Sequence, residues 1–453
     1  MGTQKLLVGF GLFLSVFAYS ILSYTLVRSQ TLELFSVYSG LFLLCYFLLR
    51  NLSGLRMLLL FGLLLRLVFL WSLPHLSQDF YRFLWDGNIQ WMGINPYIHT
   101  PNRLIELIQF PQSQVLFEGM GSLSQGHFSN YPPLSQWIYK AATLVHFDNL
   151  LSSVNVLRVF ILLGDLMVFI FGSRLLKILG KSPQYIGWYF LNPIVIIELF
   201  GNLHAEGIML GLTLMGAYFI FKNKLVWGSA MLSLAIAAKL LPLLILPVFF
   251  KFLGWKKGLQ MSAWILLFSG LLWFPFWEKQ MLENYMVTLR LWFNRFEFNG
   301  SLYYMVRALG YEIKGYNIIR TLGKFTPFLT LGWVFVFSFL RKNRTTNEVL
   351  KSSLWLLSIY FFSATTVHPW YVITLVGLGI MTGYLYPIIW SFTVFWSYSA
   401  YGAQAFEEQT LWLFLEYLPV YACFGYEVFK KPLLQHFQEA HFFYRQSAPR
   451  SSG

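Results

Sequence analysis

Repeated apolar runs of about twenty residues constrain this chain more than any other feature of its sequence. A helix that crosses the hydrocarbon core of a bilayer needs about 20 consecutive, mostly apolar residues, and such runs recur along the chain. Hydrophobic residues make up 57% of the sequence and charged residues only 11%, whereas a soluble domain averages about 45–50% and about 25%. A soluble enzyme, a nucleic-acid-binding protein and a disordered scaffold are therefore excluded together.

The runs predict an all-α, polytopic integral membrane protein with about 12–14 transmembrane helices and further interfacial helices in its outer loops. The run from Leu225 to Phe252 is interrupted by Lys239 and Pro242, so we expect two short helices that form a hairpin and line a cavity. Predicted spans begin near Lys5, Leu32, Leu55, Val154, Tyr185, Ala205, Leu225, Leu240, Gly258, Phe325, Val349, Trp370, Pro387 and Thr410.

Basic residues mark the predicted cytoplasmic side. Lysine and arginine total 33 against 19 acidic residues, a formal net charge of +14, and they gather at alternate turns, as the positive-inside rule requires. Two long segments, residues 74–153 and 278–324, then lie on the opposite side, together with the turn near His368. We expect one membrane domain over residues 1–446, a disordered tail over residues 447–453, and any chemistry on the non-cytoplasmic face.

The segment from Ser77 to Pro101 combines acidic, aromatic and turn-forming residues in the order SQDFYRFLWDGNIQWMGINPYIHTP. Asp79 and Asp86 are two helical turns apart, so their carboxylates would share one face of a helix. Gly87, together with the later glycine and Asn-Pro pair, is expected to break that helix into a turn. Either carboxylate could act as a general base toward a sugar hydroxyl. The alternative is a salt bridge from one of them to Arg82.

Charged residues within apolar runs are further candidates. A lysine inside a predicted span is costly unless it is functional or paired, so Lys239 either has a functional contact or pairs with Asp165 or Glu198. For Asp165 and Arg66 we expect pairing or hydrogen bonding between helices. Arg307 is a second candidate, for contact with an anion, with snorkelling to the membrane interface as its alternative.

His204 and Glu206 form a His-x-Glu pair at a predicted outer turn. No HExxH motif and no second histidine accompany them, and an open catalytic metal site generally needs three protein ligands. We therefore expect a sugar or phosphate contact there, with no metal and no cofactor. His368 is expected to bind a donor phosphate or an acceptor hydroxyl. Trp370 and Tyr371, which follow it, contact the sugar or anchor the chain at the interface.

The segment from Ser77 to Pro101 lies in the first long outer loop. It resembles the first outer loop of the GT-C glycosyltransferases, which use polyprenyl-phosphate sugars as donors. It is most similar to bacterial mannosyltransferases of glycosyltransferase family 87. The residues that carry the resemblance in this loop are Asp79, Tyr81, Arg82, Trp85, Asp86 and Gly87, then Gly93, Asn95, Pro96 and Tyr97, then Tyr131, Pro132 and Pro133. Later matches are Asn192-Pro193, Asn202, His204, Glu206, Ala238-Lys239-Leu240, Pro242 and His368-Pro369-Trp370-Tyr371. The chain departs from many members because its motif loop follows the third predicted helix and not the first.

The resemblance implies an inverting transfer of a sugar from a polyprenyl-phosphate donor to a glycolipid or other glycan acceptor. Mannose is the sugar that the resemblance favours. The reaction would take place at the outer face of a bacterial cytoplasmic membrane. Asp79 is implied as the base, with Asp86 as the second choice. Implied donor or phosphate contacts are Arg82, Lys239, Arg307 and His368. Implied substrate contacts are Tyr81, Trp85, Asn95, Tyr97, Tyr131, Asn202, His204, Glu206, Trp370 and Tyr371.

Two other functions fit parts of the sequence. A transporter or flippase of a lipid-linked sugar would also have many helices, broken spans and intramembrane charges. The large motif-rich loop and the lack of a detectable inverted repeat favour the enzyme. A structural subunit of a glycan-assembly complex is the third alternative, and it would tolerate the loss of Asp79 and Asp86.

Overall fold

Helices make up nearly all of the structure, a computed structural model that describes residues 2–144, 149–402 and 406–434. Within these residues there is no β-strand, and one isolated parallel bridge joins Phe298 to Thr366. The all-α prediction is therefore confirmed. The predicted tail, residues 447–453, lies outside the described residues.

The helices follow one another closely along the chain. Those up to the predicted hairpin are α1 (Gly2–Tyr24), α2 (Thr31–Asn51), α3 (Leu55–Leu67), α4 (Asp79–Trp91), α5 (Pro101–Leu104), α6 (Ser113–Gly119), α7 (Gly121–Gln125), α8 (Pro133–Ala142), α9 (Leu150–Ile178), α10 (Gly187–Phe190), α11 (Pro193–Val195), α12 (Glu206–Phe221), α13 (Leu225–Ala238) and α14 (Phe250–Leu253). The remaining α-helices are α15 (Trp255–Trp273), α16 (Met281–Arg295), α17 (Leu302–Lys314), α18 (Ile319–Phe335), α19 (Thr346–Ser363), α20 (Val372–Thr382), α21 (Tyr386–Thr393) and α22 (Thr410–Phe429). Short 3₁₀ or π segments extend or join them: η1 (Val68–Trp71), η2 (Pro183–Ile186), η3 (Ile196–Gly201), η4 (Leu241–Phe249), η5 (Phe274–Phe276), η6 (Val336–Leu340), η7 (Pro369–Tyr371) and η8 (Val394–Tyr401).

Five helices in the described part of the chain are long and apolar enough to cross a membrane. A sixth candidate is a pair, Pro193–Gly201 and Glu206–Phe221, bent by 112° at the break between its halves. Other predicted spans are helical but short, among them Leu225–Ala238, Leu241–Leu253 and Pro369–Thr382. The polytopic membrane architecture is thus confirmed, while the number of 12–14 spans stays a prediction.

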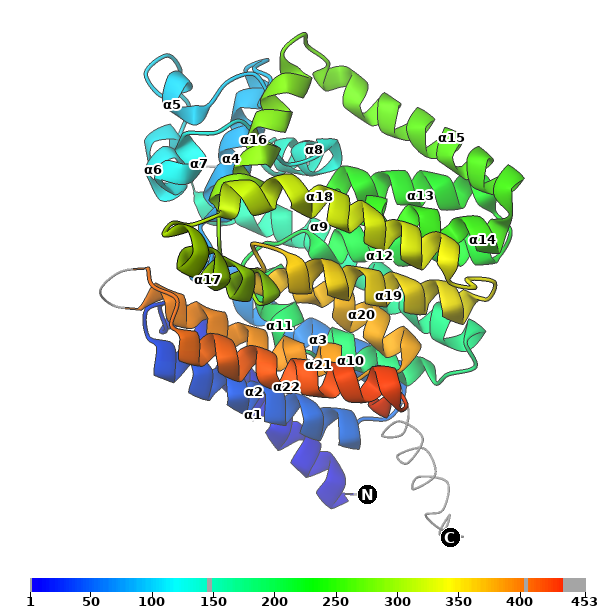
Figure 1. Cartoon of the computed structure of the whole chain (residues 1–453). Helices are drawn as coiled ribbons and strands as arrows, with labels where there is room; N and C mark the ends of the chain where they lie inside the picture. Colours follow the sequence, from blue (N-terminus) through cyan, green and yellow to red (C-terminus); the bar gives the residue numbers. More distant parts are fainter. Residues whose placement is uncertain (1, 145–148, 403–405, 435–453) are drawn as a thin grey trace.

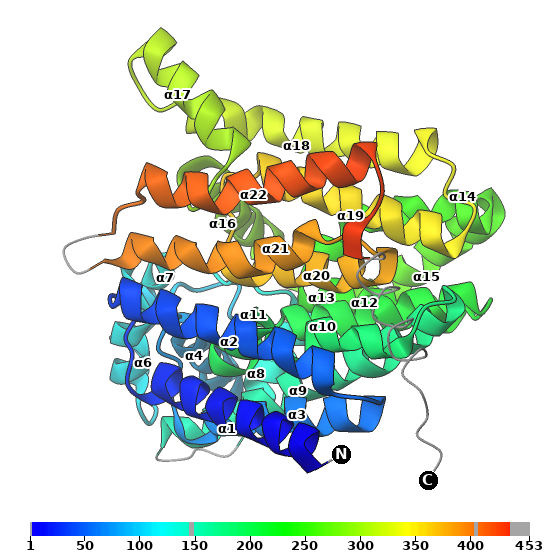
Figure 2. The same ribbon diagram turned by 90° about the horizontal axis from the view of Figure 1, so that it is seen from below.

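The long helices lie side by side in one bundle, and both long loops gather at the same end of it (Figure 1). The helices α4 to α7 of the first loop and α17 of the second loop lie at the left end, while α14 lies at the right end. In Figure 2, which is turned by 90°, the loop helices and α14 again lie at opposite ends of the bundle, and α1 and α17 lie on opposite edges of it. The two segments predicted to lie outside the membrane on one side are therefore neighbours in space.

A buried ion pair ties α3 to α9 within the bundle. Arg66 Nε donates to Asp165 Oδ2 at 2.8 Å, and neither side chain is more than 1% exposed. Arg66 also donates to the carbonyl of Phe190, and the hydroxyl of Tyr189 donates to Asp165. The expected pairing of Arg66 with Asp165 is confirmed. Such pairing is how charges are kept inside a membrane domain.

Gly87 does not end the first-loop helix, which corrects the sequence prediction. The helix α4 continues through Gly87 to Trp91, and Gly93, with φ +76°, follows its end. A Cβ atom on Gly87 would lie 2.3 Å from the carbonyl oxygen of Tyr139 in α8. The glycine therefore permits close packing of α4 on α8, and this contact sets the position of the whole motif helix.

Candidate active site

Asp79 is the first residue of α4, the helix of the first loop that carries the motif. Its side chain is half-buried, and its carboxylate accepts no hydrogen bond and forms no ion pair within residues 2–144, 149–402 and 406–434. The backbone N–H of Asp79 donates to Ser77 Oγ at 3.3 Å. Burial raises the pKa of the Asp79 carboxyl, and the ammonium of Lys239 opposes that rise. A carboxylate that is sheltered but unpartnered is well placed to accept a proton from a ligand.

Lys239 lies at the predicted interruption of the hairpin. The helix α13 ends at Ala238, Lys239 adopts an extended backbone, and the 3₁₀ segment η4 follows. This break is therefore confirmed. Lys239 Nζ forms an ion pair with Glu206 at the start of α12, and its side chain stays 25% exposed. Ser135 of α8 donates to the carbonyl of Ala238 at 2.8 Å, which fixes the lysine against the first loop.

His204 occupies a second break, between the π segment η3 and α12. Leu203 before it has φ +68°, a left-handed conformation that is uncommon for a residue with a Cβ atom. The backbone N–H of His204 donates to the carbonyl of Glu198 at 3.1 Å. Glu198 is fully buried and accepts hydrogen bonds from Asn202 Nδ2 and the hydroxyl of Tyr398. The turn holds the imidazole rigidly beside the Lys239–Glu206 pair.

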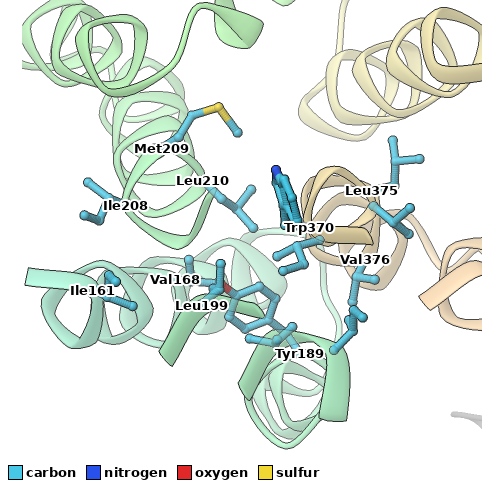
Figure 3. Close-up of a cluster of buried hydrophobic side chains, with 14 of the residues drawn as sticks. Ile161, Val168, Tyr189, Leu199, Ile208, Met209, Leu210, Trp370, Leu375 and Val376 are labelled. Carbon is cyan, nitrogen blue, oxygen red and sulfur yellow. The ribbon is translucent and has the colours of Figure 1, made fainter. Parts of the chain in front are cut away.

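Three rings stack across the site. The centroid of His204 lies 3.5 Å from that of Trp370, at an interplanar angle of 20°, and Trp370 lies 4.3 Å from His368 at 7°. Figure 3 shows Trp370 beside Leu210 of α12, with its indole nitrogen pointing away from Tyr189. The stack therefore joins α12 to the segment before α20 at the edge of a buried apolar cluster.

Lys239 connects these groups electrostatically. Burial, and after it the charge of Lys239, lowers the pKa of His368 to about 3. The same charge acts on Asp79, and the ammonium lies 5.8 Å from the ring centroid of Tyr371. Asp79, His368 and Tyr371 thus lie within range of the Lys239 charge, although the four residues come from three separate parts of the sequence.

Two buried atoms of this cluster lack hydrogen-bond partners among the described residues. They are His204 Nε2 and Glu206 Oε2. The nearest acidic atom to His204 Nε2 is Glu198 Oε2, at 3.7 Å, beyond ordinary hydrogen-bond length. Because nearly all buried polar groups in native proteins are paired, these two atoms have hydrogen-bonding capacity that the described residues leave unused.

Asp86 and Arg82 belong to a different, closed network. Arg82 Nε donates to Asp86 Oδ1 at 2.7 Å, and both side chains are at most 1% exposed. Ser129 and Gln136 donate to Asp86 Oδ2 at 2.6 and 2.9 Å. Arg82 also donates to one carbonyl within α7 and to one in the loop that follows it. The structure favours the salt-bridge alternative for Arg82. It leaves neither this arginine for a phosphate nor Asp86 for an incoming hydroxyl.

Other first-loop candidates have structural contacts. Trp85 is fully buried and packs against Phe110 and Phe117. Asn95 Nδ2 donates to the carbonyl of Phe276 at 2.8 Å and to Glu278 of the second loop at 2.9 Å, and the buried Tyr97 packs on the ring of Phe276. These three residues hold the first loop together and attach it to the second.

The remaining candidates lie at different distances from the cluster. Tyr81 is half-buried beside Phe80. Burial, and next the charge of Asp79, raises the pKa of Tyr131, which places that ring near the cluster. Arg307 of α17 pairs with Glu297, so the structure does not bring it together with Asp79.

Three contributing residues carry no sequence signal that would have revealed them. Ser135 anchors the break at Lys239, Tyr398 binds Glu198, and Phe298 lies 4.9 Å from His368, ring to ring. Serine and aromatic residues are common throughout such a chain, so only the fold identifies these three.

Comparisons with known proteins identify the family of the chain. A family model described as alpha-(1->6)-mannopyranosyltransferase, N-terminal domain, matches residues 9–255, more than half of the chain. The chain belongs to this family. The matched range contains Asp79, His204, Glu206 and Lys239, so much of the cluster lies within the part that defines the family.

Individual relatives carry the same description. Alpha-(1->6)-mannopyranosyltransferase A of Corynebacterium glutamicum is 26% identical over 213 residues, which are 44% of this chain and 40% of the relative. Alpha-(1->6)-mannopyranosyltransferase A of Mycobacterium tuberculosis is 27% identical over 169 residues, which are 37% and 31% of the two chains. The matches thus span less than half the length of these curated relatives.

Proposed function

We propose that this protein is a membrane mannosyltransferase that moves mannose from a polyprenyl-phosphate donor to a hydroxyl of a glycolipid or glycan acceptor. The proposal places the reaction on the non-cytoplasmic face of a bacterial cytoplasmic membrane, within one membrane domain of residues 1–446. The family membership supports mannosyl transfer. The observation that carries the mechanism is the half-buried carboxylate of Asp79, which lacks a partner in the described part of the chain and feels the charge of Lys239 in the Lys239–Glu206 pair.

In this mechanism Asp79 accepts the proton of the acceptor hydroxyl as its oxygen attacks the anomeric carbon. The bond between that carbon and the donor phosphate breaks, and the electron pair leaves with the polyprenyl phosphate. Attack from the face opposite the leaving group inverts the anomeric configuration.

The developing charge on the phosphate needs a cation or a hydrogen-bond donor nearby. Lys239 is 25% exposed and lies 5.8 Å from the ring centroid of Tyr371, and His204 Nε2 has no hydrogen-bond partner among the described residues, so these two are the groups assigned to the phosphate. His368, with its lowered pKa, remains neutral near pH 7 and can serve as a neutral hydrogen-bond partner.

The decisive experiment incubates the purified full chain with polyprenyl-phosphate mannose and an α-1,6-linked mannobiose glycoside as acceptor. We expect stoichiometric release of polyprenyl phosphate and formation of a mannosylated acceptor. A flippase would instead move the lipid across vesicles with the sugar–phosphate bond intact. Absence of bond cleavage across a panel of prenyl-phosphate sugars would overturn the proposal.

The pH dependence of transfer should report the ionisation of Asp79. A protonated carboxyl cannot take up the acceptor proton, so activity is full above the pKa of Asp79 and falls as the pH drops through it. Burial raises that pKa, so the fall begins at a higher pH than the ordinary aspartate value of about 3.9 predicts. The measurement is kcat/KM for the acceptor against pH.

A variant checks the assignment of this acid limb. Lys239→Gln removes the charge that lowers the pKa of Asp79, so the limb should move to higher pH whatever the remaining rate. A limb that stays at the wild-type position would contradict the assignment to Asp79.

A further inference from the structure

The helix α17 presents an apolar face that the rest of the described chain leaves uncovered. Its exposed apolar residues recur every three or four positions and are Leu302, Met305, Leu309 and Ile313. This spacing places them on one face of the helix, where each is between 43% and 75% exposed, whereas Tyr303 on the other side is buried. Contiguous exposed apolar surface of this kind marks contact with a membrane or another molecule.

Exposed cations lie next to this face. Lys314 is the last residue of α17, and Arg320 and Lys324 lie in the first two turns of α18, which begins after a link of four residues. All three side chains are exposed, and none has a hydrogen bond or an ion pair within the part of the chain that the structure describes. Figure 2 shows α17 projecting from one edge of the bundle, beside the start of α18.

Arg320 and Lys324 belong to a ridge of α18 that faces away from the protein. At the same helical spacing the ridge continues with Phe328, Leu331 and Phe335, which are 55–72% exposed. Residues Ile319–Leu340 form one of the candidate membrane spans, so lipid would cover this apolar ridge. The two cations stand at the end of the ridge and therefore at the depth of the lipid headgroups.

The charge of the second long loop supports a lipid partner. Residues 278–324 contain seven basic and four acidic residues, and the positive-inside rule does not account for a basic excess in a loop predicted to lie outside. An apolar helix face accompanied by lysine and arginine is typical of helices that lie in a membrane surface. Each such cation near the surface adds attraction to anionic lipids.

We propose that α17 lies in the membrane surface and, with the start of α18, binds the headgroups of anionic phospholipids. The apolar face of α17 inserts among the acyl chains, and Lys314, Arg320 and Lys324 contact lipid phosphates. The segment before α17 carries Phe298, whose ring contacts His368, so this lipid contact anchors the second loop beside the candidate active site. The inference does not depend on the proposed transfer of mannose.

A fluorophore at position 305 tests the contact in the full chain. Met305 is 66% exposed, while Cys45 and Cys423 are buried, so Met305→Cys takes the label selectively. The labelled protein is placed in phosphatidylcholine nanodiscs that contain a small, equal fraction of either brominated phosphatidylcholine or brominated phosphatidylglycerol. Both lipids should quench the fluorophore, and the anionic lipid should do so about fivefold more efficiently.

The cations are tested by Arg320→Gln/Lys324→Gln in the same labelled protein. Because neither side chain has a bonded partner among the described residues, the variant should fold, and quenching by brominated phosphatidylcholine should remain. The preference for phosphatidylglycerol should fall about fivefold or more. The matched control, Arg103→Gln/Lys279→Gln, removes two exposed cations from other parts of the two loops and should keep the preference.

Each outcome decides the inference. A label that neither lipid quenches would show that water, a protein partner or a second copy of the chain meets this face, and would overturn the proposal. Equal quenching by the two lipids, or a preference that survives Arg320→Gln/Lys324→Gln, would overturn the binding of anionic headgroups. None of these measurements uses a sugar substrate, so the mannosyltransferase proposal stands or falls separately.

Discussion

Asp79→Asn should reduce mannosyl transfer by about 10²–10⁴-fold, the usual contribution of a positioned general base. The substitution keeps the size and shape of the side chain but removes its ability to accept a proton. Because no ion pair or hydrogen bond holds the Asp79 carboxylate in the described structure, folding should be nearly unaffected. The measurements are transfer rate, donor binding and thermal stability of the purified variant.

The binding measurement distinguishes catalysis from recognition. The positive charge that is proposed to face the phosphate, Lys239, remains in Asp79→Asn, so affinity for the polyprenyl donor should stay within a few-fold of wild type. Near-normal turnover in this variant would exclude Asp79 as the base. It would also favour the alternative of a structural membrane subunit, which tolerates loss of this carboxylate.

Asp86→Ala should instead destabilise the fold, by about 3–5 kcal/mol, the usual result of removing one partner of a buried ion pair. The alanine leaves the guanidinium of Arg82 buried without its carboxylate, and Ser129 and Gln136 lose their acceptor. The measurement is the shift in unfolding of the detergent-solubilised protein. The double variant Arg82→Met/Asp86→Leu should recover part of the loss, because it removes both charges together.

A second substitution of Asp86 distinguishes between Asp79 and Asp86 as the catalytic base. Asp86→Asn keeps one oxygen for Arg82, so folded protein should retain transfer activity within about tenfold of wild type. If Asp86→Asn abolished transfer at normal stability while Asp79→Asn did not, the two roles would be exchanged.

Several features of the fold follow from local sequence. Long apolar runs must be helical in lipid, because every backbone polar group there needs an internal partner. The interruption of the hairpin at Lys239 and the pairing of Arg66 with Asp165 follow from the cost of charge in an apolar segment, and the structure has both. Gly87 shows the limit of such local rules. Its lack of a side chain serves contact with α8, and the helix continues.

Other features depend on which segments meet in space. The sequence offered Asp165 and Glu198 as partners of Lys239, but the ion pair forms with Glu206. Nothing in the spacing of residues across different helices fixes such distances. The stack of His204, Trp370 and His368 likewise joins segments more than 160 residues apart.

The sequence by itself determined that this is a helical membrane protein whose acidic, aromatic first loop carries the motifs of a glycosyltransferase family. Only the tertiary structure decided which of the two carboxylates, Asp79 or Asp86, is free to accept a proton from a ligand. Asp79 and Asp86 have the same chemistry and lie on one helix, so local pattern cannot separate them. Their environments differ because Arg82, Ser129 and Gln136 converge on Asp86, while the Asp79 carboxylate feels the Lys239 charge and has no hydrogen-bond or ion-pair partner among the described residues.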